Sequence, residues 1–366
     1  MDLPNFPWDS LAGAARLASE YPGGAVDLSV GTPVDPVPEI LREALASASA
    51  LPGYPATHGT PELRQAAVAA LERRYGITGV PAEAVLPTVG SKELVAWLPT
   101  LLGLGPGDVV ALPELAYPTY EIGARLAGAT AVRLADTEPA APGTRLRWLN
   151  SPSNPTGDIA AVSVLAEVVR QAREIGAVVA SDECYLALGW AAQPVSVLHP
   201  RVSGGDHSGL LAVHSLSKSS NMAGYRAGFV TGDPELVAIL LAVRKHAGMM
   251  VARPVQQAMV AALSDDTHVA QQRDRYARRR ELLLPALDRA GLRVQQSQGG
   301  LFLWCTAGEP CWDTVTRLAE LGVLVAPGEF YGPAGVRHVR VALTATDERI
   351  AAAVDRLTML PGAETG

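Results

Sequence analysis

Val213-His214-Ser215-Leu216-Ser217-Lys218 is the stretch from which the fold and the chemistry of this chain follow most directly. It completes an apolar run that begins at Leu210, and this run predicts a buried strand that ends in small hydroxyl residues and a lysine. A lysine held at the edge of a sheet core is desolvated, which lowers the pKa of its amine. The amine is then free to attack a carbonyl carbon. Taken alone, Ser-x-x-Lys is a common tetrapeptide, and most lysines lie on the surface.

A second basic residue, Arg226, follows eight residues after Lys218. Glycines flank it in Gly224-Tyr225-Arg226-Ala227-Gly228, where the pattern predicts the opening of another strand. A guanidinium binds phosphate oxygens through paired hydrogen bonds, so Arg226 and Ser215 predict an anion site beside the lysine. An imine-forming amine next to a phosphate site is the combination that pyridoxal phosphate (PLP) requires.

Length and composition restrict the class of protein. The 366 residues suit about two domains, and 48% hydrophobic with 18% charged residues is typical of a soluble globular chain. A net charge of −7 argues against nucleic acid, and no apolar run reaches the length of a membrane span. Three scattered cysteines favour a reducing compartment without a metal site, and the first residues do not resemble a signal peptide. We therefore expect a cytoplasmic enzyme with small-molecule partners.

Apolar strands alternate with amphipathic helices through most of the chain. Strands are predicted at 26–30, 85–89, 108–112, 131–134, 146–149, 177–180 and 210–213. This alternation predicts an α/β fold with a mostly parallel sheet covered on both faces. Ligands bind beyond the carboxyl ends of the strands in such sheets, and Asn154, Asp182 and Lys218 all follow a predicted strand end. We therefore expect these three side chains to meet.

Three loops carry weaker signals. Gly90-Ser91-Lys92 joins a strand to the start of an apolar helix, where free N–H groups and the helix dipole suit an anion. Gly31 follows the first strand, where a glycine either allows close approach of a ligand or simply makes a turn. Tyr54 lies in an irregular loop, and an aromatic residue there either packs or contributes to function.

The pattern changes after residue 265. A long helix at 266–287 leads to strands near 292–295, 301–306, 323–326 and 339–343 and to helices near 314–320 and 347–357. This mixture predicts a second, smaller α+β domain. The basic stretch at 273–280 alternates with apolar residues, and we interpret it as a solvated helix face. We expect an N-terminal arm and part of the small domain at 1–38, the large domain at 39–265 and the small domain at 266–366.

Four motifs together resemble the class I/II aminotransferases, which are PLP enzymes of fold type I. The motifs are Asn154-Pro155-Thr156-Gly157, Ser181-Asp182-Glu183-Cys184-Tyr185, Ser215-Leu216-Ser217-Lys218 with Gly224-Tyr225-Arg226, and Arg340-Val341-Ala342-Leu343. Their order matches that of the family, and the likeness runs from about Asp27 to Leu343. It implies a mostly parallel seven-stranded sheet in the large domain, bound PLP, and a homodimer with shared active sites.

The resemblance implies roles for individual residues. Lys218 matches the lysine that binds PLP and shuttles a proton, and Asp182 matches the carboxylate that keeps the pyridine nitrogen protonated. With Tyr185 they form the expected catalytic set. The other matches are Gly90, Ser91, Lys92, Ser215 and Arg226 at the phosphate, Asn154 and Tyr185 at the ring O3′, and Tyr117 on the ring face.

The substrate site follows from the same resemblance. Arg340 matches the arginine that holds the substrate α-carboxylate, assisted by Asn154 and the backbone of Gly31. A surface arginine on a strand is the alternative. Tyr54 matches the tyrosine that reaches the phosphate in the neighbouring subunit.

Further segments resemble the actinobacterial N-succinyldiaminopimelate aminotransferases of lysine and diaminopimelate biosynthesis. The segments are Phe6-Pro7-Trp8-Asp9, Leu28 to Pro36, Tyr54-Pro55-Ala56-Thr57, and Lys245 to Met250. This implies transfer of an amino group from L-glutamate to N-succinyl-2-amino-6-oxopimelate. The distal carboxylate needs a further cation, for which Arg244, Lys245, His246 and Arg253 are candidates by position or simply helix-end residues.

Four alternatives remain to be weighed. Another amino-acid aminotransferase or a PLP-dependent carbon–sulfur β-lyase starts with the same loss of the Cα proton, so the catalytic residues do not separate them. A non-catalytic PLP-binding regulator is disfavoured because no helix-turn-helix precedes Asp27, and a Rossmann protein because no Gly-x-Gly-x-x-Gly follows the first strand.

Overall fold

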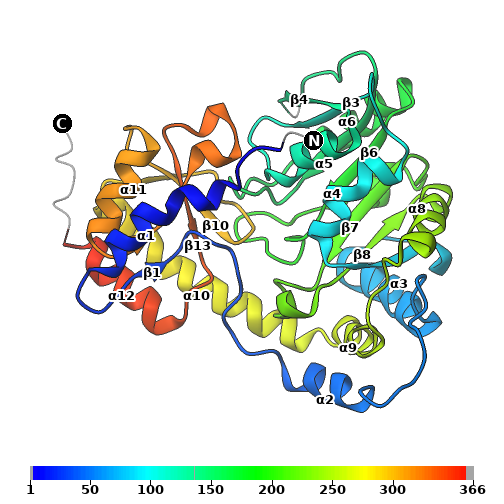
Figure 1. The fold of residues 1–366 in the computed structure, drawn as a ribbon, viewed down its shortest axis with the longest axis horizontal. Coiled ribbons are helices and arrows are strands. Elements are labelled where there is room, and N and C mark those ends of the chain that lie inside the picture. Colours follow the sequence, from blue (N-terminus) through cyan, green and yellow to red (C-terminus); the bar gives the residue numbers. More distant parts are fainter. Residues whose placement is uncertain (1–2, 136, 360–366) are drawn as a thin grey trace.

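The computed structural model describes residues 3–135 and 137–359 (Figure 1). Its largest element is a seven-stranded sheet with the order β2-β8-β7-β6-β5-β3-β4. The strands are β2 (Val85–Val89), β3 (Val109–Pro113), β4 (Thr130–Leu134), β5 (Thr144–Asn150), β6 (Val178–Asp182), β7 (Leu210–Ser215) and β8 (Ala227–Gly232). Strands β3 to β7 run parallel, whereas β8 is antiparallel to both β2 and β7. The predicted α/β fold with a mostly parallel seven-stranded sheet is confirmed.

Helices bury both faces of this sheet. Neighbouring strand residues alternate between two cores: Val85 and Leu210 point into one, Leu86 and Leu211 into the other. The first core is closed by α2 (Glu39–Ser47), α3 (Pro61–Tyr75), α6 (Val162–Glu174), α7 (Pro200–Ser203) and α9 (Arg253–Ser264). The second is closed by α4 (Ser91–Leu101), α5 (Thr119–Ala127) and α8 (Pro234–Ala247). Two buried faces explain why the strands read as continuous apolar runs.

A third core belongs to the smaller sheets. These are β12-β13-β10-β9 and the pair β1-β11, where Val26 lies opposite Val323 and attaches the N-terminal segment. The strands are β1 (Val26–Asp27), β9 (Arg293–Gln295), β10 (Phe302–Thr306), β11 (Val323–Leu324), β12 (Ala326–Pro327) and β13 (Val339–Ala342). The helices are α1 (Ala12–Ser19), α10 (Thr267–Arg289), α11 (Cys311–Glu320) and α12 (Asp347–Leu357), seen at the left of Figure 1. This core contains residues from 1–38 and from the chain after 265. We therefore propose that 1–38 and 266–366 form the small domain and that 39–265 forms the large domain.

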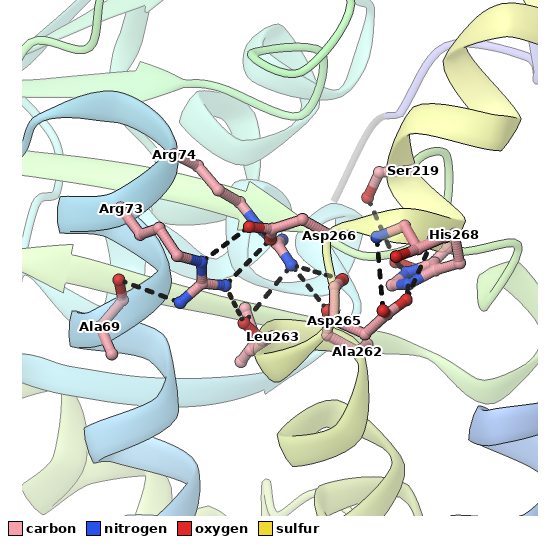
Figure 2. Close-up of polar contacts among 11 residues, drawn as sticks. Ala69, Arg73, Arg74, Ser219, Ala262, Leu263, Asp265, Asp266 and His268 are labelled. Atoms are coloured by element: carbon pink, nitrogen blue, oxygen red, sulfur yellow. Dashed lines mark hydrogen bonds and ion pairs between the residues drawn. The ribbon is translucent and has the colours of Figure 1, made fainter.

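Two arginines fix the junction between α9 and α10 (Figure 2). Arg73 and Arg74, at the end of α3, each donate to the carboxylate of Asp266, at 2.7 and 2.5 Å. Both also reach carbonyl oxygens at the end of α9, including that of Leu263. The last carbonyls of a helix have no partner within the helix, so these guanidinium groups satisfy them.

His268 connects the same junction to the loop that follows Lys218. Its Nδ1 lies 2.6 Å from the carboxylate of Asp265, and its Nε2 lies 2.9 Å from the hydroxyl of Ser220. The junction between the two parts of the chain is therefore tied to the segment that carries the lysine.

The basic stretch at 273–280 is not wholly solvated, and the prediction is wrong at Arg279. Its side chain is buried and forms ion pairs with Asp35, at 2.5 Å, and with Asp347, at 2.7 Å. Asp35 comes from the N-terminal segment, and nothing in the local pattern of α10 reveals that distant partner.

Among the helices of the described residues, none combines the length and the apolar character that a membrane span requires.

Candidate active site

The ends of β5, β6 and β7 bring the predicted residues together. Lys218 lies just beyond β7, and its Nζ donates a hydrogen bond to the carbonyl oxygen of Gly31. Burial lowers the pKa of Lys218 to about 8, and the positive charges of Arg340 and Arg226 act in the same direction. The lysine thus lies within electrostatic reach of both predicted anion-binding arginines.

Asp182 ends β6 and is buried. Its carboxylate accepts hydrogen bonds from the hydroxyl of Tyr120, at 2.8 Å, and from the N–H of Cys184, at 3.2 Å. Burial raises the pKa of Asp182, and no described lysine, arginine or histidine pairs with it. A buried carboxylate without a cationic partner suits a ligand that brings a positive charge, such as a protonated pyridine nitrogen.

Sequence reasoning missed Tyr120. The residue is fully buried in the first turn of α5, and its ring stacks on Trp148 at 4.8 Å. The available signal was its position three residues after Tyr117, in the segment that leaves β3. Tyr117 itself packs edge-on against Tyr120, with the ring centroids 5.7 Å apart.

We expect Tyr120→Phe to shift the pH dependence of turnover. The hydrogen bond from Tyr120 lowers the pKa of Asp182, so its loss raises that pKa and moves the acidic limb of the profile to higher pH. Turnover near pH 6 should fall about tenfold, with a smaller loss at pH 8. The measurement is the pH profile of the glutamate half-reaction, and an unshifted acidic limb would contradict the assigned contact.

An anion cradle lies at the start of α4. Gly90 has φ 73° and precedes the helix, and a Cβ there would lie 2.2 Å from a guanidinium nitrogen of Arg226. Gly228 pairs with Ser215, and a Cβ on Gly228 would lie 3.2 Å from the N–H nitrogen of Ser91. The arginine, the serine and the first N–H groups of the helix therefore adjoin one another, and the glycines leave room for these close approaches. This is a suitable environment for a phosphate group.

Lys92 follows Ser91 in the first turn of α4, and its side chain contacts the N-terminal segment. Its ammonium lies 5.4 Å from the centre of the Phe6 ring in the N-terminal segment. Burial and then Arg226 lower the pKa of Lys92.

Arg340, on β13, faces the same site from the small sheet. Its side chain is 3% exposed, and its Nη atoms donate to Asn154 Oδ1, at 2.7 Å, and to the carbonyl oxygen of Ser29, at 2.6 Å. Its Nε has no partner within the described chain. The guanidinium carbon lies 3.8 Å from the centre of the Phe302 ring, which fixes the plane of the fork. A buried, oriented guanidinium with a free N–H is suited to a carboxylate.

Further contacts hold Asn154 and Tyr185 at the site. Asn150, which sequence reasoning did not select, accepts from the N–H of Asn154 at 2.7 Å and donates to the carbonyl oxygen of Asp182 at 2.8 Å. Tyr185 is buried edge-on against Phe302, and burial raises the pKa of its hydroxyl.

Some predicted residues lie elsewhere. Tyr54 is 95% exposed and contacts none of the residues above in this chain. Among the candidates for a distal cation, Arg244 is fully buried and bound to Glu93 at 2.7 Å, so its charge is already neutralised. The remaining candidates, which are exposed, are Lys245, His246 and Arg253.

Comparison with known proteins gives a consistent result. The family model "Aminotransferase class I and II" matches residues 24–357. The chain belongs to this family. It is 66% identical over 359 residues to the "probable aminotransferase Rv1178" of Mycobacterium tuberculosis, covering 97% of this chain and 85% of the relative.

Two other relatives differ in the substrate that their names give. One is the 4-dedimethylamino-4-oxo-anhydrotetracycline transaminase OxyQ of Streptomyces rimosus, 59% identical, covering 98% of this chain and 99% of the relative. The other is a solved structure of a probable N-succinyldiaminopimelate aminotransferase of Thermus thermophilus, 30% identical with a TM-score of 0.86, covering 97% and 100% of the two chains.

As a class I and II aminotransferase, the chain is a PLP-dependent transaminase, and its residues fit this cofactor. The cradle around Gly90 and Arg226 would hold the phosphate, and the carboxylate of Asp182, which has no cationic partner among the described residues, would pair with the ring nitrogen. When bound, PLP supplies an electron sink that makes loss of the substrate Cα proton feasible.

In the PLP-free protein we expect Lys218 to make stability depend on pH. The folded-state pKa, about 8, lies below the ordinary 10.5, so between these values the unfolded chain binds more protons and stability rises with pH. Lys218→Met should therefore stabilise the PLP-free protein at pH 7 by on the order of 2 kcal/mol. Denaturant titrations of both proteins should show this difference shrink toward pH 10.5, and a constant difference would contradict it.

Proposed function

We propose that this aminotransferase transfers the amino group of L-glutamate to N-succinyl-2-amino-6-oxopimelate and forms N-succinyl-LL-2,6-diaminopimelate. The observation that carries the proposal is the Arg340 site, because glutamate and the product share an α-carboxylate that one oriented guanidinium would bind in turn. The N-succinyldiaminopimelate aminotransferase named among the solved structures supports the acceptor.

We assign the roles in catalysis as follows. Lys218 Nζ takes the proton from the substrate Cα and delivers it to the carbon on the other side of the transferred nitrogen. The lowered pKa of the amine favours its neutral form, which is the form that accepts a proton. Asp182 would hold a proton on the ring nitrogen, while Asn154 and Tyr185 would hydrogen-bond the ring hydroxyl and Tyr117 would lie against the ring. The phosphate would be held by Gly90, Ser91, Lys92, Ser215 and Arg226.

We also propose a homodimer in the cytoplasm, with Tyr54 reaching the phosphate of the partner subunit. Its 95% exposure leaves the side chain free to reach a partner subunit. The exposed Arg253, which donates to the carbonyl oxygen of Pro52 in the same loop, would then lie near the shared site.

A second candidate acceptor is a bulky cyclic ketone. The 59% identity with OxyQ, whose name specifies an oxo-anhydrotetracycline, favours this alternative. The two acceptors differ in charge, because the succinylated oxo acid carries carboxylates.

The test is a panel of acceptors offered to glutamate-loaded enzyme in single-turnover reactions. Conversion of the succinylated oxo acid at least about tenfold faster than aromatic, branched or cyclic ketones would support the proposal. Preference for the cyclic ketone would favour the second candidate. Release of pyruvate from a cystathionine-like substrate, without 2-oxoglutarate from glutamate, would instead indicate a β-lyase.

A further inference from the structure

A buried tyrosine beside Arg340 has a hydroxyl group with no partner. Tyr331 ends η4 (Gly328–Tyr331) and is 0% exposed, and its ring centre lies 4.9 Å from the guanidinium carbon of Arg340. Neither its hydroxyl nor the Nε of Arg340 has a hydrogen-bond partner among the described residues. A buried polar group left unpaired is destabilising, so each such group in a folded protein calls for an explanation.

Two groups near Tyr331 are hydrogen-bond donors without an acceptor in the described chain. The guanidinium of Arg340 can only donate hydrogen bonds. The indole N–H of Trp8 is also a donor, and it is buried without a partner. The Trp8 ring lies 6.5 Å from that of Tyr331. Trp304 contributes another ring edge-on at 6.1 Å. Burial raises the pKa of Tyr331 to about 12, so the hydroxyl keeps its proton at neutral pH. Unpaired donors in one place are satisfied by an anionic ligand.

We propose that the Tyr331 hydroxyl binds substrate, by donating a hydrogen bond to the carboxylate that Arg340 holds. The ligands are α-amino and α-oxo acids, so the inference rests on the role proposed for Arg340. The hydroxyl adds a third donor to the guanidinium fork and makes the site more selective for a carboxylate over an amide.

The backbone of Tyr331 is positioned for this role. Its carbonyl oxygen accepts from the N–H of Ala116 and from Arg133 Nη1, both at 2.8 Å. Ala116 immediately precedes Tyr117 and Arg133 lies on β4, so these bonds link the segment after β12 to the segment leaving β3 and to β4. Tyr331 is therefore fixed before substrate arrives, which limits the entropy lost on binding.

The N-terminal segment covers the tyrosine. Trp8, in η1 (Pro7–Leu11), lies 5.4 Å from Phe330 and 5.6 Å from Phe6, measured between ring centres. Figure 1 shows this segment running from the side of the seven-stranded sheet toward α1. Aromatic cover excludes water, which strengthens hydrogen bonds to a charged ligand.

The experiment compares Tyr331→Phe with Thr231→Val in the holoenzyme. Thr231, in β8, also carries a buried hydroxyl without a partner, and Val is its isostere, so it is the matched control. In the glutamate half-reaction, Tyr331→Phe should raise the dissociation constant for glutamate about tenfold, while the cofactor absorbance and its pH titration stay unchanged. Thr231→Val should leave the dissociation constant within about twofold.

Two results would overturn the inference. One is an unchanged dissociation constant for glutamate in Tyr331→Phe, and the other is an altered cofactor spectrum, which would place the hydroxyl at the cofactor. Because the hydroxyl is unpaired without ligand, ligand-free Tyr331→Phe should be at least as stable as the parent protein, and a lowered Tm would contradict the premise.

The outcome is separable from that of the proposed function. The glutamate half-reaction needs no acceptor, so rejection of the succinylated oxo acid leaves the Tyr331 result standing. If Arg340→Lys also left glutamate binding unchanged, the assignment of Arg340 as the residue that binds the carboxylate would be wrong. If only Tyr331→Phe were without effect, the error would lie in this inference alone.

Discussion

Replacing Lys218 with alanine is expected to lower transamination by at least about four orders of magnitude. Lys218 has the only amine that the structure describes within reach of the Gly31 carbonyl and near both Arg226 and Arg340. Its loss removes both the group that would bind PLP covalently and the base that would move the Cα proton. Stopped-flow spectra of the glutamate half-reaction measure the rate, and the absorbance of lysine-bound cofactor should disappear.

Two controls accompany this variant. Lys218→Arg keeps a cation without a nucleophilic amine and should be equally inactive. A small primary amine added to Lys218→Ala should restore a measurable part of the rate, because the cavity left by the side chain admits a free base. Turnover near the parent rate in Lys218→Ala would remove the lysine from the mechanism.

The second large effect is expected for Arg340→Lys. An ammonium cannot form the paired hydrogen bonds of a guanidinium, and it leaves Asn154 Oδ1 and the carbonyl oxygen of Ser29 competing for its donors. We expect kcat/KM for glutamate to fall about 10²- to 10³-fold, mainly through KM, with the cofactor absorbance unchanged.

Arg356→Lys is the matched control for that change. Arg356 is a buried arginine of α12, and its Nη1 donates to the carbonyl oxygens of Gly24 and Gly322, both at 2.9 Å. The same chemical change there should lower Tm and leave the kinetics of glutamate unaltered. Equal losses of kcat/KM in both variants would show that Arg340 supports the stability of the fold rather than binding the substrate carboxylate.

Local sequence patterns predicted that residues following three of the strands would lie at one edge of the sheet. Asn154, Asp182 and Lys218 each follow an apolar run, and parallel strands place their carboxyl ends along one edge. The antiparallel direction of β8 was not predicted, because an apolar strand reads the same in either direction. It matters for function, since it brings Arg226 back to the edge where β7 ends and beside Gly90.

Other features were not predictable from the sequence because their role appears only in a contact between distant segments. Tyr120 reads as an ordinary helix residue until its hydroxyl is placed against Asp182, 62 positions away. Tyr331 reads as a core aromatic until its unpaired hydroxyl is found beside Arg340. Arg279 reads as a solvated basic residue until Asp35 reaches it.

The alternation of strands and helices, the layered sheet, and the chemical groups that end each strand all follow from the amino-acid sequence. These features depend on periodicity and residue type, which are local properties. Tertiary packing sets which donors remain without acceptors and which charges are neutralised, as that of Arg244 is by Glu93. Burial and pairing are set by segments far apart in the chain, so the chemistry of the site depends on packing that no single stretch encodes.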